Sequence, residues 1–471
     1  MFSNDSSNGV DLMLKNPKKA LINMSIPLII SLLITSFYNL IDAFWVSGLG
    51  ADVLAGVGFF TPIFMILVGF GNGLGSGAAF ALSKYLGEGN KQKADNASIH
   101  SIIINIIVSL VITIILLILL NPILNAMGAG QTIGYATDYG VIILLGSIFI
   151  ILSNALYGIF RGEGDTKRPM YAMVFSAILN MILDPVFIYA FDLGVKGAAV
   201  ATIISSIFVI LILIYWFYVK KDTYLKPNLS NFDFKRDISK DIIKVGIPAS
   251  IQLLNNAFFA AVFSALLTFV GSTDSVAVYS TGWRIVIIGT TPLLAIGTTL
   301  ISVIAANYGA KNYENIKIAH RYAMKISIII AFIVAILTNV FAGNLAFIFT
   351  SSGTSVRIAS ELTNFLQWIV IYYPTMAVGV ASTYVFQGIG KGITAMFQTI
   401  MRETGFTIFF AVLFGVFLGY GVWGAWMGIV LGEIVSNNIT MLWADYLIKR
   451  LISINDESLS VSFCSFSNKN L

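Results

Sequence analysis

The sequence predicts an all-α membrane protein with twelve transmembrane helices in two six-helix lobes, related by a pseudo-two-fold axis along the membrane normal. Three observations predict this fold: the composition, a succession of long apolar runs, and an internal repeat. Hydrophobic residues make up 57% of the 471 positions and charged residues only 11%. About a quarter of the residues of a soluble domain are charged, so a soluble globular fold is excluded.

Twelve apolar runs have the length needed to cross a bilayer. A helix needs about 20 apolar residues to span a hydrocarbon core about 30 Å thick, and residues 102–120 form the clearest such run. The runs are continuously apolar rather than alternating, which favours helices over the strands of a β-barrel. The predicted spans are 21–47, 53–82, 97–120, 134–158, 169–191, 196–219, 242–270, 277–306, 318–343, 358–387, 394–418 and 422–448.

Four short motifs occur twice in the same order along the chain. The pairs are 24–33 with 245–254, 83–94 with 306–317, 161–166 with 387–392, and 193–203 with 420–430. Six spans per copy is an even number, so both copies cross the membrane in the same direction, as in parallel-repeat transporters. The repeat predicts an N-lobe at 1–220, a cytoplasmic linker at 221–240, a C-lobe at 241–450 and a polar cytoplasmic tail at 451–471.

Lysine and arginine predict the orientation, because loops that stay in the cytoplasm carry an excess of them. They are concentrated in the N-terminus, the loops after even-numbered spans and the C-terminus, whereas the opposite loops show only Lys196 and Arg357. Both termini are therefore expected to be cytoplasmic in a multi-pass protein of the cell (plasma) membrane. Residues 1–19 lack the apolar core of a removable signal peptide. The net charge of +5 belongs to this bias, and no nucleic-acid partner is expected.

The composition also argues against a metal or redox cofactor. A single cysteine, Cys464, excludes an internal disulfide and a cysteine-based centre, and the only histidines are His100 and His320. The glycines at 69–77 superficially resemble a nucleotide loop. They lie inside an apolar span, however, and no Lys-Ser or Lys-Thr pair follows them.

Two aspartates lie inside predicted spans, Asp42 in the first and Asp184 in the fifth. A charge at that depth is costly and usually marks a transport path. The repeat sets Phe263 opposite Asp42, and Phe406 or Phe410 near the position of Asp184, so only the first lobe carries this acidic set. The sequence therefore predicts a polar cavity inside the N-lobe.

Polar neighbours of the two aspartates share their helix faces. Tyr38 lies four residues before Asp42, and Asn180 lies four residues before Asp184, a spacing that puts each pair on one face of a helix. Carboxylate, amide and hydroxyl oxygens suit a hard cation such as Na⁺. An aspartate in a poorly hydrated cavity can instead carry a proton. The coupling ion, H⁺ or Na⁺, stays open.

Pro185 follows Asp184 directly. A proline inside a helix removes one hydrogen bond and frees the carbonyl four residues earlier, which here belongs to Met181. The freed carbonyl is a further candidate oxygen ligand. An ordinary kink in a membrane helix explains Pro185 equally well.

Several motifs are specific in combination: LIDAFWVSGLG (40–50), RGEGDTKRPM (161–170), ILNMILDPVFIY (178–189), GVKGAAVAT (194–202) and FQGIGKG (386–392). With them, and with Pro27 in the first span, residues 1–450 resemble the multidrug and toxic compound extrusion (MATE) transporters, most closely the prokaryotic and archaeal branch. The resemblance implies a cation or proton site of Tyr38, Asp42, Asn180, Asp184 and Thr202, in which Na⁺ would bind Asp42, Asn180, Asp184 and Thr202. It also makes Asn154 a neighbour of the site, so that Tyr38, Asn154 and Met181 are the candidate substrate-pocket residues.

The expected function is an antiporter, not an enzyme, that exchanges H⁺ or Na⁺ for amphipathic, often cationic organic compounds by alternating access. It is expected to work as a monomer. The alternative is a flippase of a lipid-linked precursor, which would need several basic residues in its cavity to hold pyrophosphate. An intramembrane prenyl transferase would need clustered carboxylates such as DDxxD for Mg²⁺, and the sequence has none.

Charged residues in the second lobe leave more than one interpretation open. Glu433, near the middle of the twelfth span, is either functional or a paired structural carboxylate. Arg402 and Glu403 in the eleventh span, and Asp445 in the twelfth, lie near cytoplasmic ends, where long side chains are expected to reach the membrane interface. Arg284 either approaches the cavity or pairs with a carboxylate.

Overall fold

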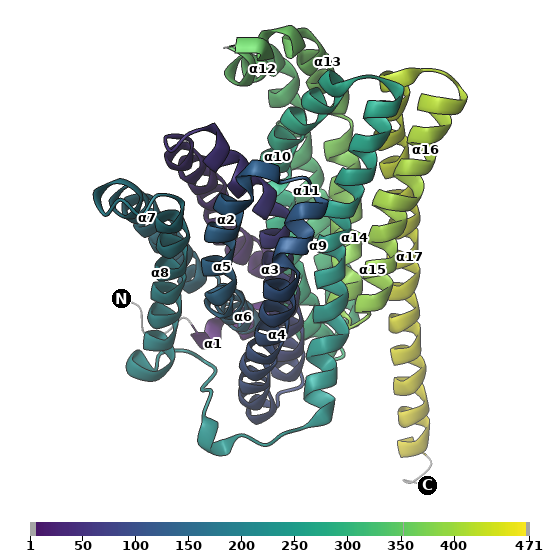
Figure 1. Cartoon of the computed structure of the whole chain (residues 1–471). Helices are drawn as coiled ribbons and strands as arrows, with labels where there is room; N and C mark the ends of the chain where they lie inside the picture. Colours follow the sequence, from purple (N-terminus) through teal and green to yellow (C-terminus); the bar gives the residue numbers. More distant parts are fainter. Residues whose placement is uncertain (1–5, 352, 468–471) are drawn as a thin grey trace. The chain divides into compact units, whose positions relative to one another are not determined.

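The computed structural model describes residues 6–351 and 353–467, and this part of the chain is helical without strands. Its α-helices are α1 (Ser6–Lys15), α2 (Pro17–Ser47), α3 (Ala51–Gly87), α4 (Lys91–Ala126), α5 (Ile133–Leu145), α6 (Ser147–Gly162), α7 (Lys167–Pro185), α8 (Val195–Ile214), α9 (Arg236–Val270), α10 (Thr273–Gly309), α11 (Tyr313–Val340), α12 (Ala342–Thr350), α13 (Ala359–Ile369), α14 (Tyr372–Gly388), α15 (Gly392–Ile400), α16 (Ile408–Val412) and α17 (Gly421–Ser467) (Figure 1). Short 3₁₀ segments are η1 (Gly130–Thr132), η4 (Leu229–Asn231) and η5 (Gly353–Ile358). π-helical segments are η2 (Val186–Ala190), η3 (Tyr215–Lys220), η6 (Met401–Thr407) and η7 (Leu413–Phe417).

The helices agree closely with the predicted spans. Among the described residues, nine helices are long and apolar enough to cross a membrane, and the number rises to eleven when each of two bent pairs is taken as one span. The predicted twelfth span lies inside α17. Its middle is more polar than the other spans because it carries Glu433, Asn437 and Asn438.

Two predicted spans are not single helices. The prediction of one helix at 134–158 is wrong, because α5 and α6 meet at Gly146 with a bend of 50° between their axes. The prediction of one helix at 358–387 is wrong in the same way, because α13 and α14 are bent by 49° relative to each other. A side chain at Gly146 would collide with Ile203 of α8, so the close approach at the bend requires glycine. Pro374 lies in the first turn of α14, where its missing N–H costs no hydrogen bond.

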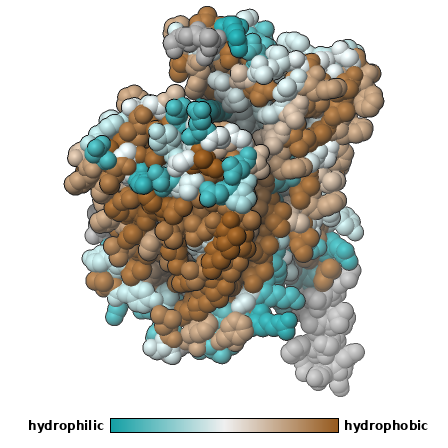
Figure 2. Space-filling view, in the orientation of Figure 1, coloured by the Kyte–Doolittle hydropathy of each residue, from teal (hydrophilic) through white to brown (hydrophobic). Residues whose placement is uncertain are grey.

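The outer face of α4 shows how these helices meet lipid. Its exposed apolar residues include Ile107, Leu110, Ile114 and Ile118, which recur every three or four positions and so form one stripe. Figure 2 shows a broad apolar surface across the middle of the displayed face, with polar side chains gathered at its edges. This distribution is that of a multi-pass membrane protein.

The chain forms two compact units. Among the described residues, the first contains 6–9, 23–85 and 90–258, and the second contains 10–22, 86–89, 259–351 and 353–467. In the first unit α7 packs along α8, and α5 also packs on α8 (Figure 1). The core of the second unit is rich in aromatic residues, among them Phe263, Phe365 and Trp426.

The predicted tail begins as a continuation of α17, which ends at Ser467. Residues 468–471 and the side chain of Cys464 lie outside the described part of the chain. The predictions for the tail and for this cysteine therefore stay predictions.

The predicted linker is fastened to the start of α4 within the first unit. The Asp95 Oδ1 atom accepts a hydrogen bond of 2.7 Å from the Lys226 amide, and the Asn96 Nδ2 atom donates one of 2.6 Å to the Asp233 carbonyl. The His100 Nε2 atom lies 3.0 Å from the Lys235 amide. Because an amide N–H only donates, this ring nitrogen is the acceptor.

Replacing His100 with phenylalanine should loosen this attachment. The ring can still pack against the linker, but the Lys235 amide loses its acceptor, and a lost hydrogen bond of about 1 kcal/mol corresponds to about five-fold faster local opening. Hydrogen exchange measured over residues 225–237 should accelerate accordingly, while exchange in α8 stays unchanged. Equal exchange of the linker in both proteins would show that His100 does not hold it.

Candidate functional site

The first half of the candidate site comes from α2. Tyr38 and Asp42 lie one turn apart on this helix, and both side chains are half-buried. Pro27 interrupts the hydrogen bonding of α2 about three turns before Tyr38, and the Ser31 hydroxyl donates to the Pro27 carbonyl at 2.7 Å. α2 therefore combines a polar face with a locally weakened backbone.

The second half comes from the end of α7. Asp184 is fully buried and Asn180 is 2% exposed, so the predicted shared face is turned into the first unit. The helix changes at Pro185, after which the chain continues as the π-helix η2. Pro185 has no N–H for the Met181 carbonyl, and the next amide, that of Val186, donates to Leu183.

The two aspartates meet. The Asp42 and Asp184 carboxyl groups are hydrogen-bonding neighbours, although 142 positions separate them in the sequence. An ionised carboxylate only accepts hydrogen bonds, whereas a protonated one donates as well. Two carboxyl groups in contact therefore need either one proton or a cation between them.

Hydroxyl groups surround this pair. The phenols of Tyr38 and Tyr139 both hydrogen-bond the Thr202 side chain, and both lie within electrostatic reach of Asp42 and Asp184. The Thr202 hydroxyl donates to the Ala198 carbonyl at 3.1 Å, so its oxygen is left to accept from the phenols. The cluster therefore gathers oxygen atoms from side chains of α2, α5, α7 and α8. Oxygen is the ligand atom that hard cations prefer.

Tyr139 was not among the predicted site residues. It is 8% exposed and its ring packs edge-on against Phe60 with centroids 5.5 Å apart. The signal in the sequence was weak, because Tyr139 lies at the polar start of the predicted fourth span, where a tyrosine is equally suited to the membrane interface.

Asn154 lies on α6. Its Nδ2 atom donates to the Ile150 carbonyl of its own helix at 2.9 Å, and its side chain packs against Gly71 of α3. These described contacts are not with the carboxyl pair. Its assignment to the substrate pocket, like that of Met181, stays a prediction.

Arg402 and Glu403 correct an expectation. They were expected to reach the membrane interface, but they are turned into the second unit: the Arg402 Nη2 atom lies 2.7 Å from Glu403 Oε1, and the Arg402 Nε atom lies 3.6 Å from Glu433 Oε1. Their side chains are only 10% and 14% exposed. Glu433 is thus a paired carboxylate, one of the two interpretations left open.

The other two charged residues of the second unit have different surroundings. The Asp445 Oδ1 atom lies 3.6 Å from the Nδ1 atom of the buried His320, and its side chain is 34% exposed. Arg284 is exposed on α10. Its role stays open.

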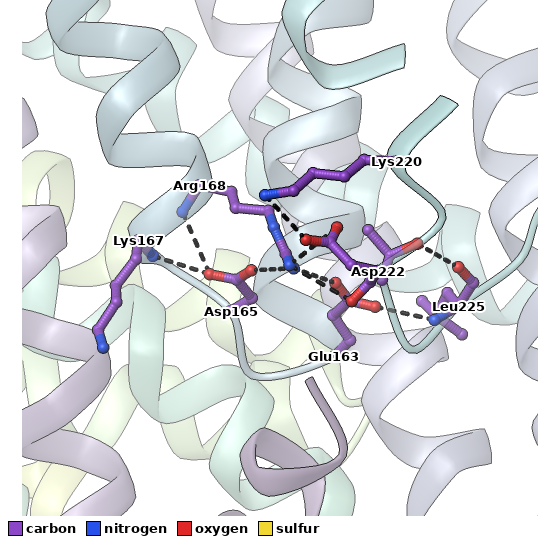
Figure 3. A network of polar contacts seen from close by, with 8 residues as sticks. Glu163, Asp165, Lys167, Arg168, Lys220, Asp222 and Leu225 are labelled. Atoms are coloured by element: carbon purple, nitrogen blue, oxygen red, sulfur yellow. Dashed lines mark hydrogen bonds and ion pairs between the residues drawn. The ribbon is translucent and has the colours of Figure 1, made fainter. Parts of the chain in front are cut away.

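A network of charges joins the loop after α6 to the linker (Figure 3). Arg168 lies at its centre: its Nη1 atom is 2.6 Å from Asp165 Oδ2, and its Nη2 atom is 3.1 Å from Asp222 Oδ1. Glu163 is fully buried beside them, and its Oε2 atom accepts a 2.9 Å hydrogen bond from the Leu225 amide. Burial raises the pKa of the Glu163 carboxyl to about 8, and the nearby Asp165 adds to the effect.

This pKa predicts a pH dependence of stability. Because the folded protein binds the Glu163 proton more tightly than the unfolded chain does, stability falls as the pH rises from the ordinary glutamate pKa towards about 8. Replacing Glu163 with glutamine should remove this decrease while keeping an oxygen for the Leu225 amide. Melting temperatures measured across this pH range should converge at low pH and favour the variant at high pH. Parallel curves would contradict the assignment.

Comparison with known protein families identifies the fold. The MatE family model matches residues 27–186 and 248–415, and the two matches begin at Pro27 and Pro248, which the internal repeat also pairs. The chain belongs to the MatE family. The fold class is thereby confirmed as an all-α membrane fold of twelve helices in two lobes.

Individual relatives match over nearly the whole chain. The multidrug export protein MepA of Staphylococcus aureus is 26% identical over 444 residues, which is 94% of this chain and 96% of MepA. A crystal structure of MATE in complex with MaL6 is 36% identical with a TM-score of 0.92, covering 94% of this chain and 99% of that one. A transporter of the MOP superfamily from Pyrococcus furiosus is 37% identical with a TM-score of 0.91, covering 94% and 98%; its binding pocket is described as having reverse polarity that suggests a different function.

Proposed function

We propose that this MatE protein is an antiporter that uses a gradient of H⁺ or Na⁺ to export amphipathic organic cations. The observation that carries the proposal is the pair of carboxyl groups, Asp42 and Asp184, in contact with each other among oxygen donors. Asn180, Thr202 and Tyr38 complete the proposed ion site. The name of MepA, a multidrug export protein, supports export of varied small molecules.

Coupling follows from competition for one negative site. A proton or Na⁺ bound between the two carboxyl groups neutralises them, which weakens the attraction for a cationic substrate. An organic cation that occupies the site displaces the ion in turn. Alternating access then requires only that the two occupants favour different conformations.

The substrate pocket is proposed to lie beside the ion site. Tyr38 has a phenol ring that can stack on an aromatic guest and attract its positive charge, and Tyr139 offers a second ring. Asn154 and the Met181 carbonyl remain the other proposed pocket groups. Beyond the coupling ion, we propose no cofactor.

The proposed topology follows the sequence. An N-lobe (1–220) and a C-lobe (241–450), joined by a cytoplasmic linker (221–240), cross the cell membrane with both termini and the tail (451–471) in the cytoplasm. The monomer is proposed to be the transporting unit.

Export of cations is favoured over flipping of a lipid-linked precursor by the sign of the charge. Acidic, not basic, side chains lie within electrostatic reach of Tyr38 and Tyr139 in the described part of the chain. A pyrophosphate group would be repelled by that charge. Because a relative of similar fold is described as having a pocket of reverse polarity, the polarity of the site rather than the fold must decide the cargo.

The coupling ion can be identified in proteoliposomes that hold the purified protein and a fluorescent organic cation. A pH gradient and a Na⁺ gradient are imposed separately, and the one that alone drives movement of the dye names the ion. The proposal predicts that one of them does. Failure of both gradients to move any of several organic cations would reject it.

A further inference from the structure

The two segments that carry the aspartates of the proposed ion site meet a second time, close to the carboxyl pair. Asp42 is followed three residues later by Trp45, near the end of α2. Asp184 is followed five residues later by Tyr189, in the π-helix η2. The Tyr189 hydroxyl donates a hydrogen bond of 2.6 Å to the Trp45 carbonyl. This bond joins the end of α2 directly to η2.

The end of α2 explains why the Trp45 carbonyl accepts this bond. The last four carbonyls of an α-helix have no amide partner within the helix, and Trp45 is among the last four residues because α2 ends at Ser47. Its carbonyl also accepts a longer bond of 3.2 Å from the amide of Gly48, in the turn that follows. The phenol of Tyr189 therefore gives this carbonyl a partner from another part of the fold.

Gly48 leaves the space that the phenol occupies. A Cβ atom added at Gly48 would collide with the Tyr189 Oη atom, whereas it would lie 3.4 Å from the Cζ atom of the same ring. The second distance is an ordinary van der Waals contact. A side chain at position 48 is thus incompatible with the hydroxyl of Tyr189 but compatible with its ring.

The π-helix η2 sets the direction of Tyr189. The Phe191 amide donates to the Val186 carbonyl at 2.9 Å, five residues earlier, which is the hydrogen bond of a π-turn and is frequent at functional sites. The wider turn rotates Tyr189 relative to the α-helix that precedes η2. Its ring lies edge-on to the Trp45 ring, with centroids 6.3 Å apart, so the two side chains pack as well as bond.

We propose that Tyr189 is a positioning residue of the ion site, because its bond to the Trp45 carbonyl holds Asp42 and Asp184 in contact. Two carboxylates that share a site repel each other, so their contact needs support from elsewhere in the fold. Three residues along a helix correspond to about 4.5 Å, so a bond at Trp45 acts on the same part of α2 as Asp42. The inference rests on the proposed function, and it assigns Tyr189 no contact with the ion or the cargo.

Infrared titration of the carboxyl groups in purified protein tests this role. In each variant, the pair is followed as the difference from the same protein carrying Asp42→Asn and Asp184→Asn. Contact between two carboxyl groups spreads their titration steps apart. Tyr189→Phe keeps the ring without the hydroxyl, so the two steps should lie about five-fold closer in proton concentration, the effect of one ordinary hydrogen bond. Tyr38 and Tyr139, the titratable groups that face the pair in the described part of the chain, stay unchanged.

Gly48→Ala tests the same contact from the other side. The added methyl group should push the hydroxyl away from the Trp45 carbonyl and bring the titration steps together as Tyr189→Phe does. Combining the two substitutions should give no further change, because the methyl group meets only an ordinary contact once the hydroxyl is gone. The matched controls are Gly58→Ala, where an added Cβ meets open space, and Tyr171→Phe, at an exposed tyrosine of α7. Both should titrate like the unmodified protein.

Unchanged titration steps in Tyr189→Phe would overturn the proposal, as would additive changes in the double variant. A lower melting temperature with unchanged steps would mean that the contact only stabilises the fold. If Gly48→Ala does not fold, Tyr189→Phe decides alone. Failure of the proposed function is seen separately, as absence of gradient-driven movement of organic cations by the unmodified protein, because the titration itself requires no transport.

Discussion

Replacing Asp184 with asparagine should reduce gradient-driven transport of organic cations by roughly ten-fold or more, which lies inside the usual range of coupling free energies. Asparagine keeps the size of the side chain but can neither bind a proton nor carry a negative charge. The coupling ion and the cargo would therefore no longer compete for one charge. Asp42→Asn should have the same effect, because the two carboxyl groups act together.

Transport of a fluorescent cation into or out of proteoliposomes measures this effect, with the amount of reconstituted protein determined in each sample. Asp138→Asn is a suitable control, since Asp138 is an exposed carboxylate of the same unit. It lies 3.3 Å from Lys196 at the surface, and surface ion pairs contribute little to the free energy of folding. The control should transport like the unmodified protein. Normal transport by Asp184→Asn would remove the acidic pair from the mechanism.

Replacing Arg168 with glutamine should be the most destabilising single change of charge in the first unit. It would leave Asp165 and the buried Glu163 without their guanidinium neighbour, and Asp222 would keep only Lys220 as a cationic partner (Figure 3). Removing one partner from a buried ion pair typically costs about 3–5 kcal/mol, and Asp165 loses the cation that lies 2.6 Å from it. The loop after α6 and the linker residues around Asp222 should come apart.

Thermal unfolding in detergent is the measurement, and Lys167→Gln is the control. Lys167 is the adjacent basic residue, and its backbone amide, which donates to Asp165 Oδ1 at 3.0 Å, survives the substitution. The melting temperature should fall strongly for Arg168→Gln and little for Lys167→Gln. Equal decreases in both variants would mean that the network has no specific role.

Much of the fold is predictable because lipid imposes a simple rule. Only helices satisfy their backbone in a bilayer, so continuously apolar runs indicate the spans directly, and the repeat indicates their grouping. The bends were not predictable from those runs. At the break, Gly146 packs so closely against Ile203 that an added side chain would collide with it, and Ile203 is 57 positions away on another helix.

The candidate site, too, was predictable where it depends on spacing along one helix and not where it depends on contacts between helices. Spacing along one helix pairs Tyr38 with Asp42 and Asn180 with Asp184, but it does not bring the two helices together. The polar cavity was expected from the depth of the two aspartates in spans of one lobe, and the complete residue set from the family resemblance. Tyr139 was missed because its own helix shows no other site residue. Likewise, the partner of Glu433 could not be inferred from the sequence, since Arg402 is brought to it by the packing of α17 against η6.

The most direct test of the account is whether an organic cation displaces the ion that we propose is held between Asp42 and Asp184. Purified protein in weakly buffered detergent solution, preloaded with radioactive Na⁺ in a parallel sample, is mixed with a fluorescent organic cation. The account predicts that binding of the dye releases either protons or Na⁺, and that the protein with both Asp42→Asn and Asp184→Asn releases neither. Dye binding without release of either ion, or the same release from the double variant, would contradict it.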